Sequence, residues 1–149
     1  MTDILVINGP NLNMFGLREP EIYGAETLAY FEAKIGALCA EFGKSCRCFQ
    51  SNLEGELVTA IQNASRTETV DAARAIIINA AAYTHTSVAL RDALTLFSGP
   101  KIEVHVSNVM KREPFRHESF ISPVCDGIII GLGVNSYLLA VRAVNDLLS

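Results

Sequence analysis

The sequence predicts an α/β domain built on a doubly wound, five-stranded parallel sheet with helices on both faces, a three-layer α/β/α arrangement. Short runs made almost wholly of Val and Ile are typical of strands that are buried on both faces of a parallel sheet. These runs alternate with segments whose apolar residues recur at helical spacing. At 149 residues, half of them apolar, the chain has the size of one ordinary domain. We therefore expect a single domain over residues 1–149.

The first half of the chain supplies two strands and two helices. Ile4–Ile7 is the first strand, and from Thr27 the apolar residues follow a helical period that ends just before the helix breaker Gly43. A second strand is expected at Cys46–Gln50. The letters "SNLE" that begin at Ser51 resemble a capping box, which opens a helix.

The second half continues the alternation. We expect strands at Ala75–Ile78, Ile102–Val106 and Ile128–Ile130, and helices at Ser87–Phe97 and Ser136–Leu148. Five short strands with helices between them are the pattern of a flavodoxin-like doubly wound sheet.

Two connections, Gly9–Glu26 and Asn108–Asp126, exceed the usual length of a loop in such a domain. Long loops of this kind are functional lids or disordered segments. Polar or glycine residues also follow every strand, as in "NGPN", "QSN", "NAAAYTHTS", "HVSN" and "GLG". Ligands of open parallel sheets bind beyond the carboxyl ends of the strands, so these residues should form the site. The Thr and Ser residues of "NAAAYTHTS" are expected to open a helix whose free N–H groups suit an anion or an oxygen-rich ligand.

Charge and hydropathy exclude several classes of protein. The net charge of −4 argues against a nucleic-acid-binding surface but allows a small acidic ligand held by local arginines. No apolar stretch approaches the ~20 residues of a membrane span, and the first strand is too short for the core of a signal peptide. We expect a cytoplasmic protein.

Metal, disulfide and nucleotide motifs are weak. The four cysteines form no CxxC pair and are expected to be reduced and mostly buried, while His85, His105 and His117 lack metal-ligand spacing. The glycine-containing turns lack the endings of phosphate-binding or dinucleotide-binding loops. A receiver-type switch domain would carry Asp at the end of the third strand, where Asn79 stands.

The strand "IEVHVS" places Glu103, His105 and Ser107 on one face by period-two alternation. A buried Glu and His are costly unless they pair. The paired carboxylate would fix the imidazole tautomer and favour its protonated form, as a general acid requires. A purely structural ion pair is the alternative, and the position at the carboxyl end of a strand favours catalysis.

Both long loops carry arginines. Arg18 lies five residues before Tyr23, and a nearby guanidinium can stabilise the phenolate that a tyrosine base requires. Arg112 and Arg116 in the second loop could bind a carboxylate bidentately. The alternatives are surface packing for the first pair and solvated charges for the second.

Seven motifs, in this order, carry a resemblance that runs from Ile4 to near the C-terminus: "NGPNLN", "REPEIYG", "QSNLEGELV", "THTSVALRDAL", "IEVHVSN", "REPFRHES" and "GIIIGLG". In these the chain resembles type II 3-dehydroquinate dehydratases. The resemblance implies a flavodoxin-like fold, no cofactor or metal, and a homo-oligomer, a dodecamer of four trimers. It also implies conversion of 3-dehydroquinate to 3-dehydroshikimate by anti elimination of water through an enolate, in the shikimate pathway or in quinate catabolism.

The resemblance also implies a role for each catalytic residue. Tyr23 would remove the C2 proton, with Arg18 favouring its phenolate, and Asn11 would position a water that stabilises the enolate. His105, held by Glu103, would then protonate the departing C1 hydroxyl. An acid and a base on opposite faces of the substrate suit this chemistry.

The remaining residues match the family's substrate-binding positions. They are Asn79, His85, Val106, Ser107, Arg116 and, with a less defined role, Arg112, together with Asp92, which would reach the site of a neighbouring subunit. The chain departs from the family pattern at Ala80, where proline is expected, and at Ala81 or Ala82, where glycine is common. The alternatives are a non-catalytic binding protein for a small polyhydroxylated acid and a flavin-binding electron carrier.

Overall fold

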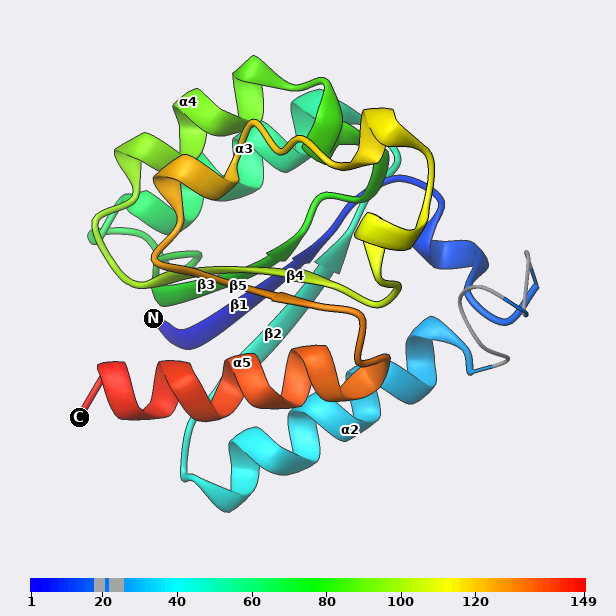
Figure 1. The fold of residues 1–149 in the computed structure, drawn as a ribbon. Helices are drawn as coiled ribbons and strands as arrows, with labels where there is room; N and C mark the ends of the chain where they lie inside the picture. Colours follow the sequence, from blue (N-terminus) through cyan, green and yellow to red (C-terminus); the bar gives the residue numbers. More distant parts are fainter. Residues whose placement is uncertain (18–20, 22–25) are drawn as a thin grey trace.

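Five parallel strands form the middle layer of the molecule, in the order β2-β1-β3-β4-β5 (Figure 1). The computed structural model describes residues 1–17, 21 and 26–149. The strands are β1 (Thr2–Asn8), β2 (Cys46–Gln50), β3 (Ala73–Asn79), β4 (Lys101–His105) and β5 (Gly127–Ile130). This strand order is that of flavodoxin-like folds, which confirms the predicted fold class.

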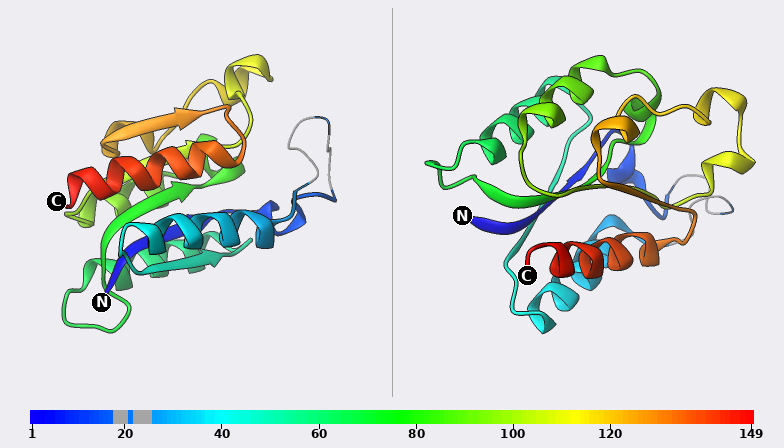
Figure 2. Two further views of the ribbon diagram at one scale, coloured as in Figure 1. Left: turned by 90° about the horizontal axis from the view of Figure 1, so that it is seen from below. Right: turned by 60° about the vertical axis from the view of Figure 1, so that its left-hand side comes forward.

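Helices cover both faces of the sheet (Figures 1 and 2). One face carries α3 (Glu54–Ser65) and α4 (Val88–Leu96), and the other carries α2 (Leu28–Glu41) and α5 (Val134–Leu147). None of the helices among the described residues has the length and apolar character that crossing a membrane requires.

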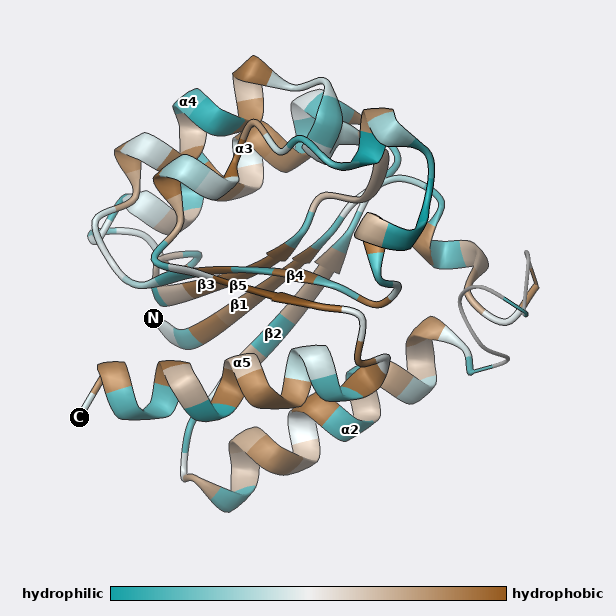
Figure 3. Ribbon diagram, viewed as in Figure 1, coloured by the Kyte–Doolittle hydropathy of each residue, from teal (hydrophilic) through white to brown (hydrophobic). Residues whose placement is uncertain are grey.

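The inner strands are apolar on both faces because each face is covered by helices. In β1, Ile4 and Val6 pack in the cluster that includes α2 and α5, and Leu5 and Ile7 pack in the cluster with α3 and α4. All four side chains are fully buried. The apolar colouring of the central strands in Figure 3 reflects this two-sided burial, and burial of such area is the main term that stabilises a sheet of this kind.

The predicted starts of α2 at Thr27 and of α4 at Ser87 are confirmed, and the predicted start of α3 is wrong in detail. Thr27 caps α2 by accepting from the Tyr30 N–H at 3.2 Å, as expected for its position. The helix α3, in contrast, begins at Glu54, so "SNLE" does not form a capping box. The Ser51 hydroxyl accepts from the Leu53 N–H at 2.9 Å and donates to Glu56 instead.

Several element boundaries differ by one or two residues from those predicted. β3 begins at Ala73, β4 covers Lys101–His105, and α5 begins at Val134 instead of Ser136. The early start of α5 follows from Gly133, whose φ of 62° turns the chain directly into the helix. Ser136 therefore lies within the first turn, where its hydroxyl accepts from the Leu132 N–H at 3.0 Å.

The two long connections contain short 3-10 turns. The described part of the first holds η1 (Leu12–Met14), and the second holds η3 (Val109–Lys111), η4 (Pro114–Arg116) and η5 (Ser122–Val124). Arg18 and Tyr23 lie outside the described residues.

The carboxyl ends of the strands meet at one edge of the sheet. The register of β1 and β3 pairs Asn8 with Asn79, so both strands end in an asparagine at the same level. The two chain termini lie at the opposite edge (Figure 1). The four cysteines are free thiols; one is buried and three are half-buried.

Candidate active site

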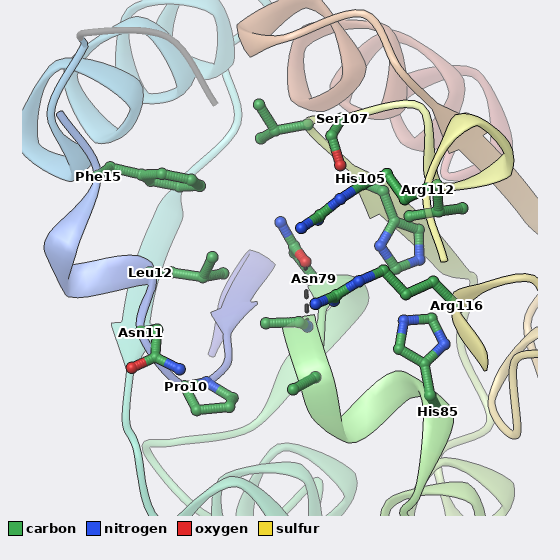
Figure 4. A pocket seen from close by; sticks show the side chains of 14 residues that line it. Pro10, Asn11, Leu12, Phe15, Asn79, His85, His105, Ser107, Arg112 and Arg116 are labelled. Atoms are coloured by element: carbon green, nitrogen blue, oxygen red, sulfur yellow. Dashed lines mark hydrogen bonds between the residues drawn. The ribbon is translucent and has the colours of Figure 1, made fainter. Parts of the chain in front are cut away.

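A cavity of about 140 Å³ lies at the carboxyl edge of the sheet (Figure 4). Its lining comes from the turn after β1, from the 3-10 turn η2 (Ala81–His85) after β3, from the end of β4 and from the second long loop. Most of the predicted site residues line it: Asn11, Asn79, His85, His105, Val106, Ser107, Arg112 and Arg116. Segments far apart in the sequence therefore converge at the edge where the sequence predicts a ligand.

Of the predicted site residues that the structure describes, Glu103 and Asp92 are not part of this lining. Glu103 lies behind His105 and is buried. Asp92 is exposed on α4, away from the lining residues of its own chain. Arg18 and Tyr23 lie outside the described residues.

Apolar residues form one wall of the cavity, and sequence reasoning missed them. Leu12 and Phe15 extend from the turn after β1 toward the cavity, opposite the arginines and His105 (Figure 4). Both side chains are buried although they belong to a connection that we expected to be irregular. The presence of two large apolar residues in a polar connection could have indicated that they are buried. One side of the cavity is therefore apolar and suits the hydrocarbon part of a ligand.

The turn after β1 lies against the end of β3. The Gly9 N–H donates to the Asn79 carbonyl at 2.8 Å, and a Cβ at Gly9 would lie 2.4 Å from the Ala80 carbonyl oxygen. Only glycine permits this approach. The backbone N–H of the cavity residue Asn11 donates to Asn52 Oδ1 at 2.9 Å, which fixes a residue whose φ is 68°. The approach of the two strand ends therefore determines the shape of the cavity floor.

The predicted pairing of Glu103 with His105 is confirmed. His105 Nε2 lies 2.5 Å from Glu103 Oε2, and both residues are at most 5% exposed. Because a carboxylate only accepts, Nε2 carries the hydrogen of this bond. Nδ1, the other ring nitrogen, is then the atom that can exchange a proton with a ligand.

His85 is held as a hydrogen-bond acceptor. Its Nδ1 lies 2.7 Å from the Glu118 carbonyl oxygen, which can only accept, so Nδ1 carries the hydrogen. Burial lowers the pKa of His85, which favours the neutral ring at neutral pH. Nε2 is then free to accept from a ligand hydroxyl, as recognition of a polyol requires.

A buried hydrogen-bond network holds Asn79. Its Nδ2 donates to the Tyr137 hydroxyl at 3.0 Å, its Oδ1 accepts from the Ala81 N–H at 3.1 Å, and the Tyr137 hydroxyl donates to Asn8 Oδ1 at 2.5 Å. Tyr137 is fully buried. Tyr137 lies within the helix predicted at Ser136–Leu148, but no role in the site was predicted for it.

Two guanidinium groups give the cavity a positive charge, although the whole chain is acidic. The side chains of Arg112 and Arg116 are 13% and 20% exposed and extend into the cavity (Figure 4). Arg116 Nε donates to both carboxylate oxygens of Glu113, at 3.2 and 3.3 Å. A site of this charge favours an anionic ligand.

The helix N-terminus expected to face the ligand is placed differently. Ser87 caps α4 by accepting from the Leu90 N–H at 2.9 Å, and η2 separates this cap from the cavity. The cavity is lined by Ala81, Ala82 and His85 of η2. Ser87 therefore opens this helix as predicted, but the cavity is lined by η2 and not by the first turn of α4.

The departure at Ala81 has a structural consequence. Ala81 adopts φ of 52°, a left-handed conformation that glycine occupies without cost and that alanine resists by about 1 to 2 kcal/mol. Its N–H bond to Asn79 Oδ1 holds it there. Backbone strain of this kind is common at functional sites.

The site combines the elements of proton-transfer chemistry on an anionic, hydroxylated molecule. It offers a carboxylate-paired histidine, a neutral histidine acceptor, an oriented asparagine and two guanidinium groups. No group of His, Cys, Asp and Glu in the described part of the chain is arranged to hold a metal ion.

Comparison with known proteins agrees with this chemistry. The family model described as "Dehydroquinase class II" matches residues 2–145. A 3-dehydroquinate dehydratase of Cereibacter sphaeroides is 54% identical over 98% of this chain and 96% of its own length. One of Bordetella avium is 55% identical over 93% of this chain and 94% of its own length. The crystal structure of a type II dehydroquinase from Butyrivibrio crossotus has 46% identity and a TM-score of 0.91, covering 97% of each chain.

Proposed function

The chain belongs to the type II dehydroquinase family, and from this premise we propose how its own residues carry out the reaction. The enzyme is a hydro-lyase that converts 3-dehydroquinate to 3-dehydroshikimate, in the shikimate pathway or in quinate catabolism. The observation that carries the residue assignment is the buried Glu103–His105 pair at the wall of a cationic cavity.

The substrate is a polyhydroxylated carboxylic acid with a ketone. In our proposal its carboxylate binds the backbone of Val106 and Ser107, close to the two guanidinium groups of the second loop. The neutral His85 accepts from a ring hydroxyl, and Asn79, oriented by Tyr137, hydrogen-bonds the substrate. The apolar wall of Leu12 and Phe15 packs against the carbon ring of the substrate.

The first step removes the C2 proton. Tyr23 acts as the base, its phenolate favoured by the guanidinium of Arg18, an assignment that rests on the motif "REPEIYG". The electron pair of the C2–H bond moves onto the C3 ketone to form an enolate, and Asn11 positions the water that stabilises it.

The second step expels the hydroxyl group. The enolate electrons form the C1–C2 double bond while the C1–O bond breaks, and His105 Nδ1 gives a proton to the leaving oxygen, which departs as water. Glu103 stays ionised and balances the imidazolium charge until that transfer. His105 lies across the cavity from Leu12 and Phe15 of the turn after β1 (Figure 4).

A pair of variants tests this division of labour. Tyr23→Phe should retain the fold but lose turnover by orders of magnitude and also lose exchange of the substrate C2 proton with solvent deuterium, because its base is gone. His105→Ala should lose turnover yet keep C2 exchange. Turnover is followed by the ultraviolet absorbance of the conjugated enone and exchange by mass spectrometry of recovered substrate, with Tyr30→Phe as the matched control for Tyr23→Phe.

Two outcomes would count against these roles. Exchange kept by Tyr23→Phe and lost by His105→Ala would reverse base and acid. A wild-type protein that binds 3-dehydroquinate without forming the enone would favour the alternative of a binding protein.

We also propose a cytoplasmic homo-oligomer, a dodecamer built as a tetramer of trimers, in which Asp92 reaches the site of a neighbouring subunit. The support is the exposed position of Asp92 on α4, beside the exposed apolar side chains of Val88 and Leu96. Light scattering should give a mass near twelve chains, and a fully active monomer of 16.2 kDa would contradict the shared site.

A further inference from the structure

Glu103 receives hydrogen bonds from two serines that the reaction scheme does not use. The carboxylate is 1% exposed on β4. In addition to His105, it accepts from the Ser119 hydroxyl, at 3.2 Å to Oε1 and 3.1 Å to Oε2, and from the Ser122 hydroxyl at Oε1. Three donors from two segments therefore surround one buried charge. A buried carboxylate without such donors would be unstable as an ion.

The orientation of Ser119 is fixed by its own neighbours. Its oxygen accepts from the backbone N–H groups of Ile121, at 3.2 Å, and Ser122, at 3.0 Å. With its lone pairs engaged in this way, the hydroxyl directs its one proton to Glu103. If Glu103 were protonated, its O–H would find no acceptor at Ser119, so this arrangement favours the ionised carboxylate.

The segment that carries both serines is firmly attached to the body of the enzyme. The Phe120 N–H donates to the Thr84 carbonyl at 2.9 Å, and Glu118 accepts from His85 at 2.7 Å. Ile121 is fully buried in the core cluster of α3 and α4. These contacts fix the position of the two hydroxyls beside Glu103.

The charges around Glu103 are consistent with an ionised group. Burial raises the pKa of Glu103, but the hydrogen bonds from His105, Ser122 and Ser119 outweigh burial and hold this pKa below its usual value. The other titratable or charged groups that face it are His85 and, from the second loop, Arg116, His117 and Cys125. Burial and the charge of Glu103 raise the pKa of the Cys125 thiol to about 12, so this thiol stays neutral.

We propose that Ser119 and Ser122 are positioning residues of the acid in the second step: they hold Glu103 as an oriented carboxylate, and Glu103 in turn holds the His105 ring aligned. This inference rests on the proposed role of His105. Neither serine transfers a proton or contacts the substrate. Their effect falls on the second step, because in the proposed scheme His105 acts as the acid of that step and the first step uses another residue as the base.

The test compares Ser119→Ala, Ser122→Ala and the double variant with the wild-type enzyme. Removing the hydroxyls takes away donors that lower the pKa of Glu103, so the carboxyl becomes protonated at higher pH and the acid limb of the kcat profile should move to higher pH. In the double variant kcat should fall roughly tenfold or more, since hydrogen bonds to charged groups are the strong ones, while KM changes little. Exchange of the C2 proton should persist.

Two further variants separate positioning from general structural support. Ser122→Thr keeps the hydroxyl and should therefore keep most of the wild-type activity that Ser122→Ala loses. Ser65→Ala is the matched control, because Ser65 is a half-buried serine on α3 that donates to the Ile61 carbonyl at 2.8 Å, far from the site. It should leave both kcat and the pH profile unchanged.

An infrared titration of the protonated-carboxyl band, assigned with Glu103→Gln, gives a readout that does not require turnover. A higher titration midpoint of Glu103 in the serine variants supports the proposal. If the wild-type protein is also inactive, the proposed function fails, but the positioning of Glu103 by the two serines stands. The proposal is overturned if the midpoint and the acid limb stay where they are in the wild type. Equal losses of C2 exchange and elimination would also overturn it.

Discussion

Tyr137→Phe removes one buried oxygen atom and should disturb both stability and substrate binding. The phenol hydroxyl donates to Asn8 Oδ1 at 2.5 Å and accepts from Asn79 Nδ2 at 3.0 Å, and the ring itself is fully buried against α2 and the sheet. Phenylalanine fills the same ring volume, so the change isolates the hydrogen bonds from the packing.

The cost follows from the groups that are left behind. Asn8 Oδ1 and Asn79 Nδ2 would each lose this partner in the interior, and an unsatisfied buried polar group costs about 1 to 3 kcal/mol. Asn8 has little room to compensate, because its Nδ2 has no hydrogen-bond partner among the described residues. We therefore expect a loss of about 2 to 4 kcal/mol in the free energy of unfolding, or roughly 5 to 10 °C in Tm for a chain of this size.

The assay compares thermal unfolding of the wild type, Tyr137→Phe and Tyr30→Phe at one protein concentration. Tyr30 lies on α2 and is 40% exposed, so its variant should stay within about 0.5 kcal/mol of the wild type. At a temperature where all three are folded, KM of Tyr137→Phe should rise several-fold, because Asn79 is no longer oriented. Equal Tm values for the two variants would refute the claim that this network stabilises the strand ends.

Three further changes test local features of the site. Gly9→Ala should destabilise the fold by about 1 to 3 kcal/mol, because the added Cβ would meet the Ala80 carbonyl. The control Gly36→Ala, on an open helix surface, should be neutral or stabilising. Equal changes in the free energy of unfolding, measured in denaturant, would contradict the close approach at Gly9. Ala81→Gly should stabilise the fold by up to about 1 kcal/mol in the same assay, because it relieves the left-handed conformation at some entropic cost, and a loss of stability would contradict that strain. Folding lowers the pKa of His85, so as the pH falls below 6.5 the unfolded chain takes up this proton before the folded chain does. The free energy of unfolding should therefore decrease in this range. If the free energy of unfolding of a His85→Gln variant falls with pH as steeply as that of the wild type, the assignment is contradicted.

The fold was predictable because it depends on patterns that are local in the sequence. Two-sided burial requires runs such as Ile4–Ile7, and the alternation in "IEVHVS" was sufficient to place Glu103 and His105 on one face. The convergence of strand ends follows from the parallel connections themselves. Much of the cavity wall could therefore be located before any coordinates were known.

The residues that support the site were not predictable in this way. Ser119 lies 16 residues from Glu103, and their contact depends on the path of a loop that has no periodic pattern. Tyr137 meets Asn8 across 129 residues, and its spacing on a helix indicates only that it is buried. The capping box predicted at Ser51 also did not form. The motif would pair Ser51 with Glu54, but the Ser51 hydroxyl donates to the side chain of Glu56, two residues further on.

The placement of both chain ends at the edge of the sheet opposite the cavity has a practical consequence for handling the enzyme. The Arg74 guanidinium at the start of β3 donates to the Leu148 carbonyl at 3.4 Å, which keeps the last residues beside the amino ends of the strands. An affinity tag, a fluorescent label or a linker to a solid support attached at Met1 or Ser149 would project away from the active site of its own chain (Figure 1). Immobilised enzyme coupled through either end should therefore keep its substrate entrance facing solution.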